Sequence, residues 1–125
     1  MTDMETMAQR INSALNDRDM TAFGSLIAED AKWGQGDIGD GRACHNRTEI
    51  IKTYKRLLDQ GVRGTVVETM TGDAGVACHL EIDWPENAPN RRRNDLYQVF
   101  LVKDGLVTHI EGMDDRDLAI EKIHL

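Results

Sequence analysis

The sequence contains little cysteine and proline, few aromatic side chains and no long apolar run. Its two cysteines, Cys44 and Cys78, have neither C-x-x-C spacing nor the density of a disulfide scaffold, so we expect free thiols and a reduced compartment. No apolar segment approaches the roughly 20 residues that cross a bilayer. The N-terminal MTDMETMAQR is acidic and polar, unlike a signal peptide. We therefore expect a cytoplasmic protein without a membrane partner.

Basic side chains are also in the minority. The 15 Lys and Arg residues stand against 22 Asp and Glu residues, giving a net charge of −7 that repels phosphate backbones. The one basic cluster, 91–93, lies in a polar stretch after two prolines and is typical of a solvated loop. The glycine-rich segment 34–41 lacks the spacing of phosphate-binding loops. We expect no nucleic-acid partner and no cofactor.

The length and the remaining composition indicate one globular domain over residues 1–125. A chain of 125 residues is too short for two independently buried cores. Its content of 40% hydrophobic and 30% charged residues is that of an ordinary folded protein rather than a disordered one.

Helical periodicity is concentrated in the first half of the chain. Apolar residues recur at three- and four-residue steps over 4–15, 19–28 and 46–61, which predicts three amphipathic helices. Asp19 and Asn46 stand where a side chain can cap the second and third helices.

Two-residue alternation dominates the second half and predicts strands. A short strand is expected over 31–35, and longer ones are expected over 65–70, 76–84, 96–102 and 106–112. Turn residues between the long strands predict antiparallel neighbours, and Asp115 can cap a final short helix. The fold class is therefore α+β, with a curved, mostly antiparallel sheet wrapped on three N-terminal helices around an interior pocket.

Three segments carry a resemblance to a known superfamily. Residues 28–33, 46–50 and 97–110 resemble the nuclear transport factor two-like (SnoaL-like) superfamily, and together with the element order the match covers nearly the whole chain. The resemblance implies a cystatin-like cone with an interior pocket and a homodimer through the outer sheet face. It also implies relatives that are isomerases, cyclases, dehydratases, hydrolases or non-catalytic domains, so fold alone does not give the function.

The catalytic places of such relatives are only partly occupied. The general-base position of isomerase-like members falls on Gln35, and a neutral amide cannot accept a proton at pH 7. The carboxylate position on the last strand falls near Gly112, with Glu111 and Asp114 as displaced substitutes. Whether the protein is an enzyme is left open.

His79 and Glu81 form the candidate catalytic pair. Two residues apart on a strand, they point to one side, where the carboxylate could orient an imidazole that acts as general base. The competing interpretation gives the interior to Cys78 and its apolar neighbours and leaves His79 and Glu81 outside, and a slip of one residue reverses the outcome. His109 and Glu111 repeat the pattern, with a surface charge pair as the alternative.

A second set of residues is expected to line the pocket and bind the ligand. These residues combine large apolar side chains with two amides that could hydrogen-bond a ligand oxygen, although core packing is the alternative for the aromatic ones. They are Trp33, Gln35, Tyr54, Met70, Gln98, Phe100 and Met113.

The leading hypothesis is a homodimeric pocket protein for a small, mostly apolar organic molecule. Acid–base chemistry of a lyase, isomerase or hydrolase is compatible with the residues, and the alternative is a non-catalytic homodimeric accessory domain with a filled core. No metal site is expected, because Cys44-His45 and Cys78-His79 would need two distant segments to converge.

Overall fold

Three helices form the first layer of the fold. The computed structural model describes residues 3–34, 44, 46–86 and 94–124, and its N-terminal helices are α1 (Met4–Asn16), α2 (Met20–Ser25) and α3 (Arg47–Asp59). Asp19 accepts a hydrogen bond from the Ala22 N–H at 3.0 Å, and Asn46 accepts one from the Glu49 N–H at 2.9 Å. Both predicted caps are confirmed.

The boundary between α2 and the first strand differs from the prediction. The helix was expected to reach residue 28 and the strand to cover 31–35, whereas α2 ends at Ser25 and β1 spans Ile27–Trp33. The Val107 N–H donates to the Leu26 carbonyl at 2.8 Å, and Ile27 pairs with Val107, so pairing with the last strand draws the chain out of the helix. Local periodicity cannot detect this, because the apolar residues fit either element.

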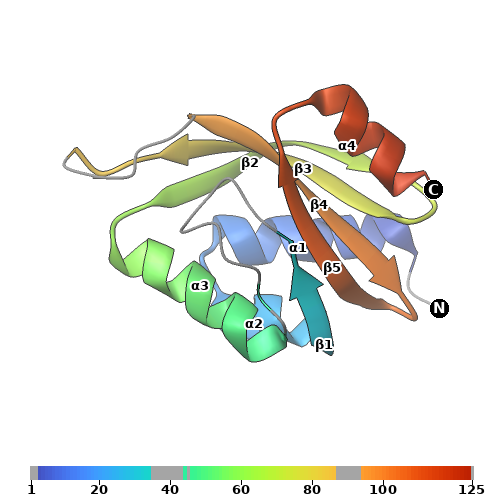
Figure 1. Ribbon diagram of the computed structural model, residues 1–125, viewed down its shortest axis with the longest axis horizontal. Helices are drawn as coiled ribbons and strands as arrows, with labels where there is room; N and C mark the ends of the chain where they lie inside the picture. Colours follow the sequence, from blue (N-terminus) through green and yellow to red (C-terminus); the bar gives the residue numbers. More distant parts are fainter. Residues whose placement is uncertain (1–2, 35–43, 45, 87–93, 125) are drawn as a thin grey trace.

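Five strands form one sheet in the order β1-β5-β4-β3-β2 (Figure 1). The long strands are β2 (Arg63–Thr71), β3 (Gly75–Asp83), β4 (Asp95–Lys103) and β5 (Leu106–Met113). They pair antiparallel, and β1 pairs parallel with β5. The predicted α+β class with a mostly antiparallel sheet is confirmed. None of the helices in the described residues is both long enough and apolar enough to span a membrane.

The sheet separates two hydrophobic clusters. Helices α1, α2 and α3 pack against its inner face, where Ile11, Phe23, Ile50, Phe100 and other side chains form the main core. The last helix, α4 (Arg116–Ile123), lies on the outer face (Figure 1), where Ala119 and Ile123 pack with outward-facing side chains of β3 and β4. The predicted cap is confirmed, because the Asp115 carboxylate accepts the Asp117 and Leu118 N–H groups.

Two irregularities in strand pairing decide which side chains face inward. In β2, Val66 pairs with Leu80 and Glu68 with His79, so Val67 is an additional residue and is 49% exposed. Such a bulge reverses the inside–outside alternation of the residues that follow it.

The second irregularity lies between β4 and β5. Leu101 pairs with His109 and Val102 with Val107, which leaves Thr108 as the additional residue. Val107 therefore faces the core, while His109 faces outward although it lies two residues further on.

Candidate functional site

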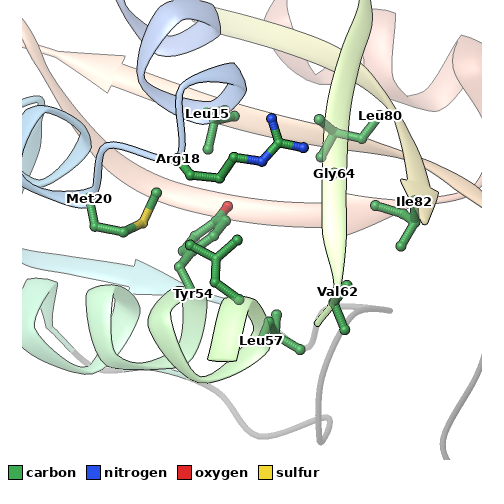
Figure 2. A pocket seen from close by; sticks show the side chains of 10 residues that line it. Leu15, Arg18, Met20, Tyr54, Leu57, Val62, Gly64, Leu80 and Ile82 are labelled. Atoms are coloured by element: carbon green, nitrogen blue, oxygen red, sulfur yellow. The ribbon is translucent and has the colours of Figure 1, made fainter. Parts of the chain in front are cut away.

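The candidate site is a small pocket between the helices and the inner face of β2 and β3 (Figure 2). Its volume is about 50 Å³, compared with the roughly 300–1,000 Å³ of pockets that bury drug-sized ligands. At about 10–15 Å³ per water, the space corresponds to a few water molecules. Apolar side chains form most of its wall. The described residues that line it are Leu15, Arg18, Met20, Tyr54, Leu57, Leu58, Val62, Gly64, Leu80 and Ile82.

Tyr54 of α3 supplies a polar group at the pocket. Its hydroxyl donates a 2.5 Å hydrogen bond to Oε1 of Gln98, a β4 side chain that is only 1% exposed. Burial raises the pKa of Tyr54 well above its ordinary value, so the hydroxyl stays protonated at physiological pH. Tyr54 is therefore a hydrogen-bond donor and not a base.

An aromatic cluster holds Tyr54 in place. Its ring stacks on Trp33, with centroids 4.9 Å apart and planes 23° apart, and meets Phe23 edge-on at 4.9 Å. Phe23 in turn meets Phe100 edge-on at 6.1 Å. The indole Nε1 of Trp33 is buried and has no hydrogen-bond partner among the described residues, and the residue is 3% exposed. Trp33 and Phe100 thus stand behind Tyr54 in the core.

The structure brings together only part of the predicted ligand-binding set. Tyr54 lines the pocket, and the other inward residues, Trp33, Gln98 and Phe100, contact Tyr54 directly or through the aromatic cluster without lining the space. Gln35 lies outside the described residues.

Met70 and Met113 lie on the opposite face of the sheet, packed against the outer cluster beneath α4. Met70 follows the bulge in β2 and pairs with Ala77, and Met113 follows the irregularity in β5 and pairs with Tyr97. Both methionines were expected to line the interior. This expectation is wrong, because the bulges reverse the inside–outside alternation of side chains along β2 and β5.

His79 and Glu81 also face outward, because Cys78 and Leu80 occupy the core side of β3. The partner of His79 is Asp95: Nε2 of the ring lies 2.9 Å from Oδ2 of that carboxylate, and the ring stacks on Tyr97 at 4.4 Å. Glu81 is exposed. His79, Glu81 and Asp95 line an open groove of about 500 Å³. Its lining is mainly polar, unlike that of the interior pocket.

His109 and Glu111 form a second outward pair. Nε2 of His109 lies 3.2 Å from Oε1 of Glu111, whose other oxygen lies 3.5 Å from Nζ of Lys122 on α4. Both residues lie on β5, so the structure shows an outward charge pair within one strand, extended to Lys122 on α4, where the sequence offered a pair across strands as the alternative. Within the described part of the chain, no three His, Cys, Asp or Glu side chains converge to hold a metal ion.

Two residues of these sites escaped the sequence reasoning. Asp95 stands one position before the predicted strand, and only the β3–β4 register, in which His79 opposes Tyr97, brings it to the histidine. Arg18 fell in a polar break between two helices, a pattern typical of solvated turns. Arg18 reaches the pocket from a backbone with a positive φ of 55°, and no residue pattern in the sequence predicts that conformation.

Solved structures share this fold across most of their length. A candidate polyketide cyclase from Pseudomonas putida covers 98% of this chain and 99% of its own, with 14% identity and a TM-score of 0.71. A candidate ketosteroid isomerase from Kribbella flavida covers 90% and 79%, with 20% identity and a TM-score of 0.68. A nuclear transport factor two-like protein of unknown function from Burkholderia pseudomallei covers 100% of both chains, with 18% identity and a TM-score of 0.68.

Sequence comparison gives the family directly. No curated protein matches the chain significantly. The sequence pattern of the SnoaL-like domain, however, matches residues 8–110, which is most of the chain and runs from within α1 to within β5, with all the pocket residues named above inside it. The protein therefore belongs to the SnoaL-like domain family.

Proposed function

We propose that the protein binds a small, mostly apolar organic molecule in the pocket between α1, α3 and the inner face of the sheet. The observation that carries the proposal is the pocket lining, in which apolar side chains surround the ring of Tyr54. Pockets of this kind gain affinity from apolar contact and orientation from a few polar groups. The candidate cyclase and isomerase among the similar structures support a small molecule as the ligand class.

The lining favours binding over proton-transfer chemistry in this pocket. Among the described residues that line it there is no Asp, Glu or His, and Tyr54 is held protonated. A general base needs an acceptor of suitable pKa within hydrogen-bond reach of the substrate. We therefore assign the interior to ligand recognition, with Tyr54 and Arg18 as the side chains with polar groups that line the space.

A methyl group added to the wall provides the test. A Cβ on Gly64 would lie 3.4 Å from Cδ1 of Ile82, an ordinary contact that narrows the pocket, whereas a Cβ on Gly24 would lie 3.6 Å from Ile51 outside it. The matched variants are Gly64→Ala and Gly24→Ala. In methyl NMR titrations with 3-methylbutan-1-ol, the wild type should show shifts for Leu57, Leu80 and Ile82.

Gly64→Ala should weaken this binding by about tenfold or more, since one methylene in an apolar pocket changes affinity by that order. Gly24→Ala should bind like the wild type. Absence of binding to the wild type by this alcohol and by similarly small neutral molecules would contradict the proposal, as would equal affinity of the two alanine variants.

A second candidate function rests on the hydrogen bond between His79 and Asp95. The carboxylate can orient the ring, which is the arrangement of a general base in an open groove. This second proposal keeps the predicted catalytic role of His79. Asp95 takes the place of Glu81 as the carboxylate that orients the ring, and Glu81 is a neighbouring charge.

Hydrolysis of p-nitrophenyl acetate tests whether His79 is an activated base. The wild type should hydrolyse the ester faster than His79→Ala, and Asp95→Asn should fall between them. Glu81→Gln serves as the control and should match the wild type, because Glu81 is exposed and Asp95 already holds the ring. Equal rates for the wild type and His79→Ala would remove the assignment.

The accessory-domain alternative concerns the outer face of the sheet. Helix α4 covers part of that face by packing Ala119 and Ile123 against β3 and β4. A homodimer through the outer face, as predicted, would therefore have to include α4, on which Leu118 is 50% exposed. Light scattering of the wild type and of Leu118→Glu tests this: loss of dimer in the variant supports the interface, and a monomeric wild type contradicts it.

A further inference from the structure

Arg18 is the charged side chain of the pocket. Among the described residues that line the space there is no acidic side chain, and none of the described carboxylates forms an ion pair with Arg18. The guanidinium donates through one nitrogen to the Asn16 carbonyl. A guanidinium has five N–H donors, so most of them remain for another acceptor.

The turn between α1 and α2 fixes the position of this arginine. Arg18 has a φ of 55°, which is uncommon for a residue with a side chain. The turn is held by backbone bonds from Arg18 N–H to Leu15 and from Asp19 N–H to Ala14, and Asn16 Oδ1 accepts from the Val66 N–H of β2 at 2.8 Å. These two backbone bonds form the Schellman motif, which ends a helix with a residue of positive φ, so the end of α1 fixes where the Arg18 side chain leaves the backbone.

The direction of the side chain places the charge over the apolar space. In Figure 2, Arg18 extends from the turn across the pocket toward the strand that carries Gly64, while Tyr54 rises from the opposite side. The flanking residues Asp17 and Asp19 are exposed, and Asp19 is engaged in capping α2. The local charge at the pocket is therefore positive in a protein whose net charge is −7.

We infer that the ligand of this pocket is a short apolar carboxylate, with its anionic group on Arg18 and its hydrocarbon part between Tyr54, Leu57 and Leu80. The inference rests on the proposed function, because it names the class of molecule bound in the same pocket. Arginine suits this task, since its planar fork matches a carboxylate with two parallel hydrogen bonds. The volume of about 50 Å³ restricts the hydrocarbon part to a few carbon atoms.

A pair of molecules that differ only in the polar group separates charge recognition from apolar binding. We would measure Kd for 3-methylbutanoate and for 3-methylbutan-1-ol above pH 7, where the acid is ionised, by methyl NMR and calorimetry. The wild type should bind the carboxylate about tenfold more tightly than the alcohol, which is the order expected for a charge-assisted hydrogen bond at a partly exposed site. Inorganic phosphate, which has no apolar part, should not bind measurably at the same concentrations.

Variants at position 18 test the role of the guanidinium. Arg18→Gln keeps a long polar side chain without charge and should bind both molecules with nearly equal affinity. Arg18→Lys keeps the charge without the fork and should show an intermediate preference. Arg18→Asn is a second neutral variant that tolerates positive φ, so it protects the test if Arg18→Gln folds poorly.

The outcomes distinguish the inference from the proposed function. If the wild type binds the alcohol and the carboxylate equally, or if both neutral variants keep the preference for the carboxylate, the inference is overturned and apolar binding stands. If neither molecule binds, the proposed function fails as well. Preference in the wild type that disappears in the neutral variants supports both.

Discussion

The hydrogen bond between Tyr54 and Gln98 allows a quantitative test of how the pocket is built. Tyr54→Phe keeps the ring contacts with Trp33 and Phe23 and removes only the hydroxyl, which leaves the buried Gln98 Oε1 without this donor. An unsatisfied buried polar group costs about 1–3 kcal/mol. At roughly 3–5 °C per kcal/mol for a domain of this size, the melting temperature should fall by about 3–15 °C.

A double-mutant cycle isolates the interaction. Gln98→Met preserves approximate volume and leaves the Tyr54 hydroxyl without its acceptor, so it should also be destabilising. Tyr54→Phe combined with Gln98→Met replaces both polar partners by apolar groups, which is nearly neutral in other proteins. The sum of the single losses should therefore exceed the loss in the double variant by at least about 1 kcal/mol.

Urea unfolding followed by tryptophan fluorescence and circular dichroism provides the free energies. Tyr97→Phe is the matched control, because Tyr97 lies on the outer face and no hydrogen bond of its hydroxyl is found among the described residues, so its change should stay within about 0.5 kcal/mol. A Tyr54→Phe variant as stable as the wild type, or strictly additive losses in the cycle, would refute the reasoning.

Three further predictions concern packing and burial. A Cβ on Gly75 would lie 2.2 Å from a carbonyl oxygen of β4, so Gly75→Ala should lower the yield of folded protein in a solubility assay; a fully soluble variant of native stability would contradict this. Ile123→Ala removes a fully buried side chain of α4 and should cost about 2–5 kcal/mol in urea unfolding, and a loss below 1 kcal/mol would show that α4 is dispensable. Burial raises the pKa of the Cys78 thiol to about 12, so its alkylation at pH 8, followed by peptide mass mapping, should be on the order of a thousandfold slower than in the unfolded chain.

Acid unfolding gives a prediction for the ion pair on the outer face. The hydrogen bond from Arg116 lowers the pKa of Glu68, so the folded state favours the carboxylate. A depressed pKa contributes stability above the unfolded value, and this stability is lost as the pH falls below about 4.3 through the folded value. Arg116→Gln should therefore lose less stability than the wild type over that range, and identical acid titrations of stability would contradict the assignment.

Sequence patterns predicted the elements well where the signal is local. The caps at Asp19, Asn46 and Asp115 lie where their side-chain chemistry placed them, because a cap needs only a short polar side chain and three free N–H groups. The end of α2 was misplaced because pairing between Ile27 and Val107, 80 positions apart, decides it. A contact between residues so far apart cannot be recognised from the pattern of ten consecutive residues in the sequence.

The candidate site was harder to predict for the same reason. Alternation along β3 left two interpretations open, and the structure shows the one that gives the interior to Cys78 and Leu80. Met70 and Met113 both follow an additional residue in their strands, and neither bulge carries a glycine or proline that would signal it. Side-chain direction beyond a bulge depends on the partner strand, and the sequence of one strand does not contain that information.

The bulges also explain why the two faces of the sheet differ in chemistry. If β5 continued its alternation from Val107, His109 would face the interior; the additional Thr108 turns the imidazole outward beside Glu111. The interior then presents neutral groups, Tyr54 of α3 and Gln98 of β4, and receives its charge from Arg18 in the turn between α1 and α2. A pocket with a cation, a protonated phenol and no lining carboxylate among its described residues is suited to hold an anion rather than to remove a proton. We therefore propose binding for the interior and keep the outer groove at His79 and Asp95 as the candidate place for proton transfer.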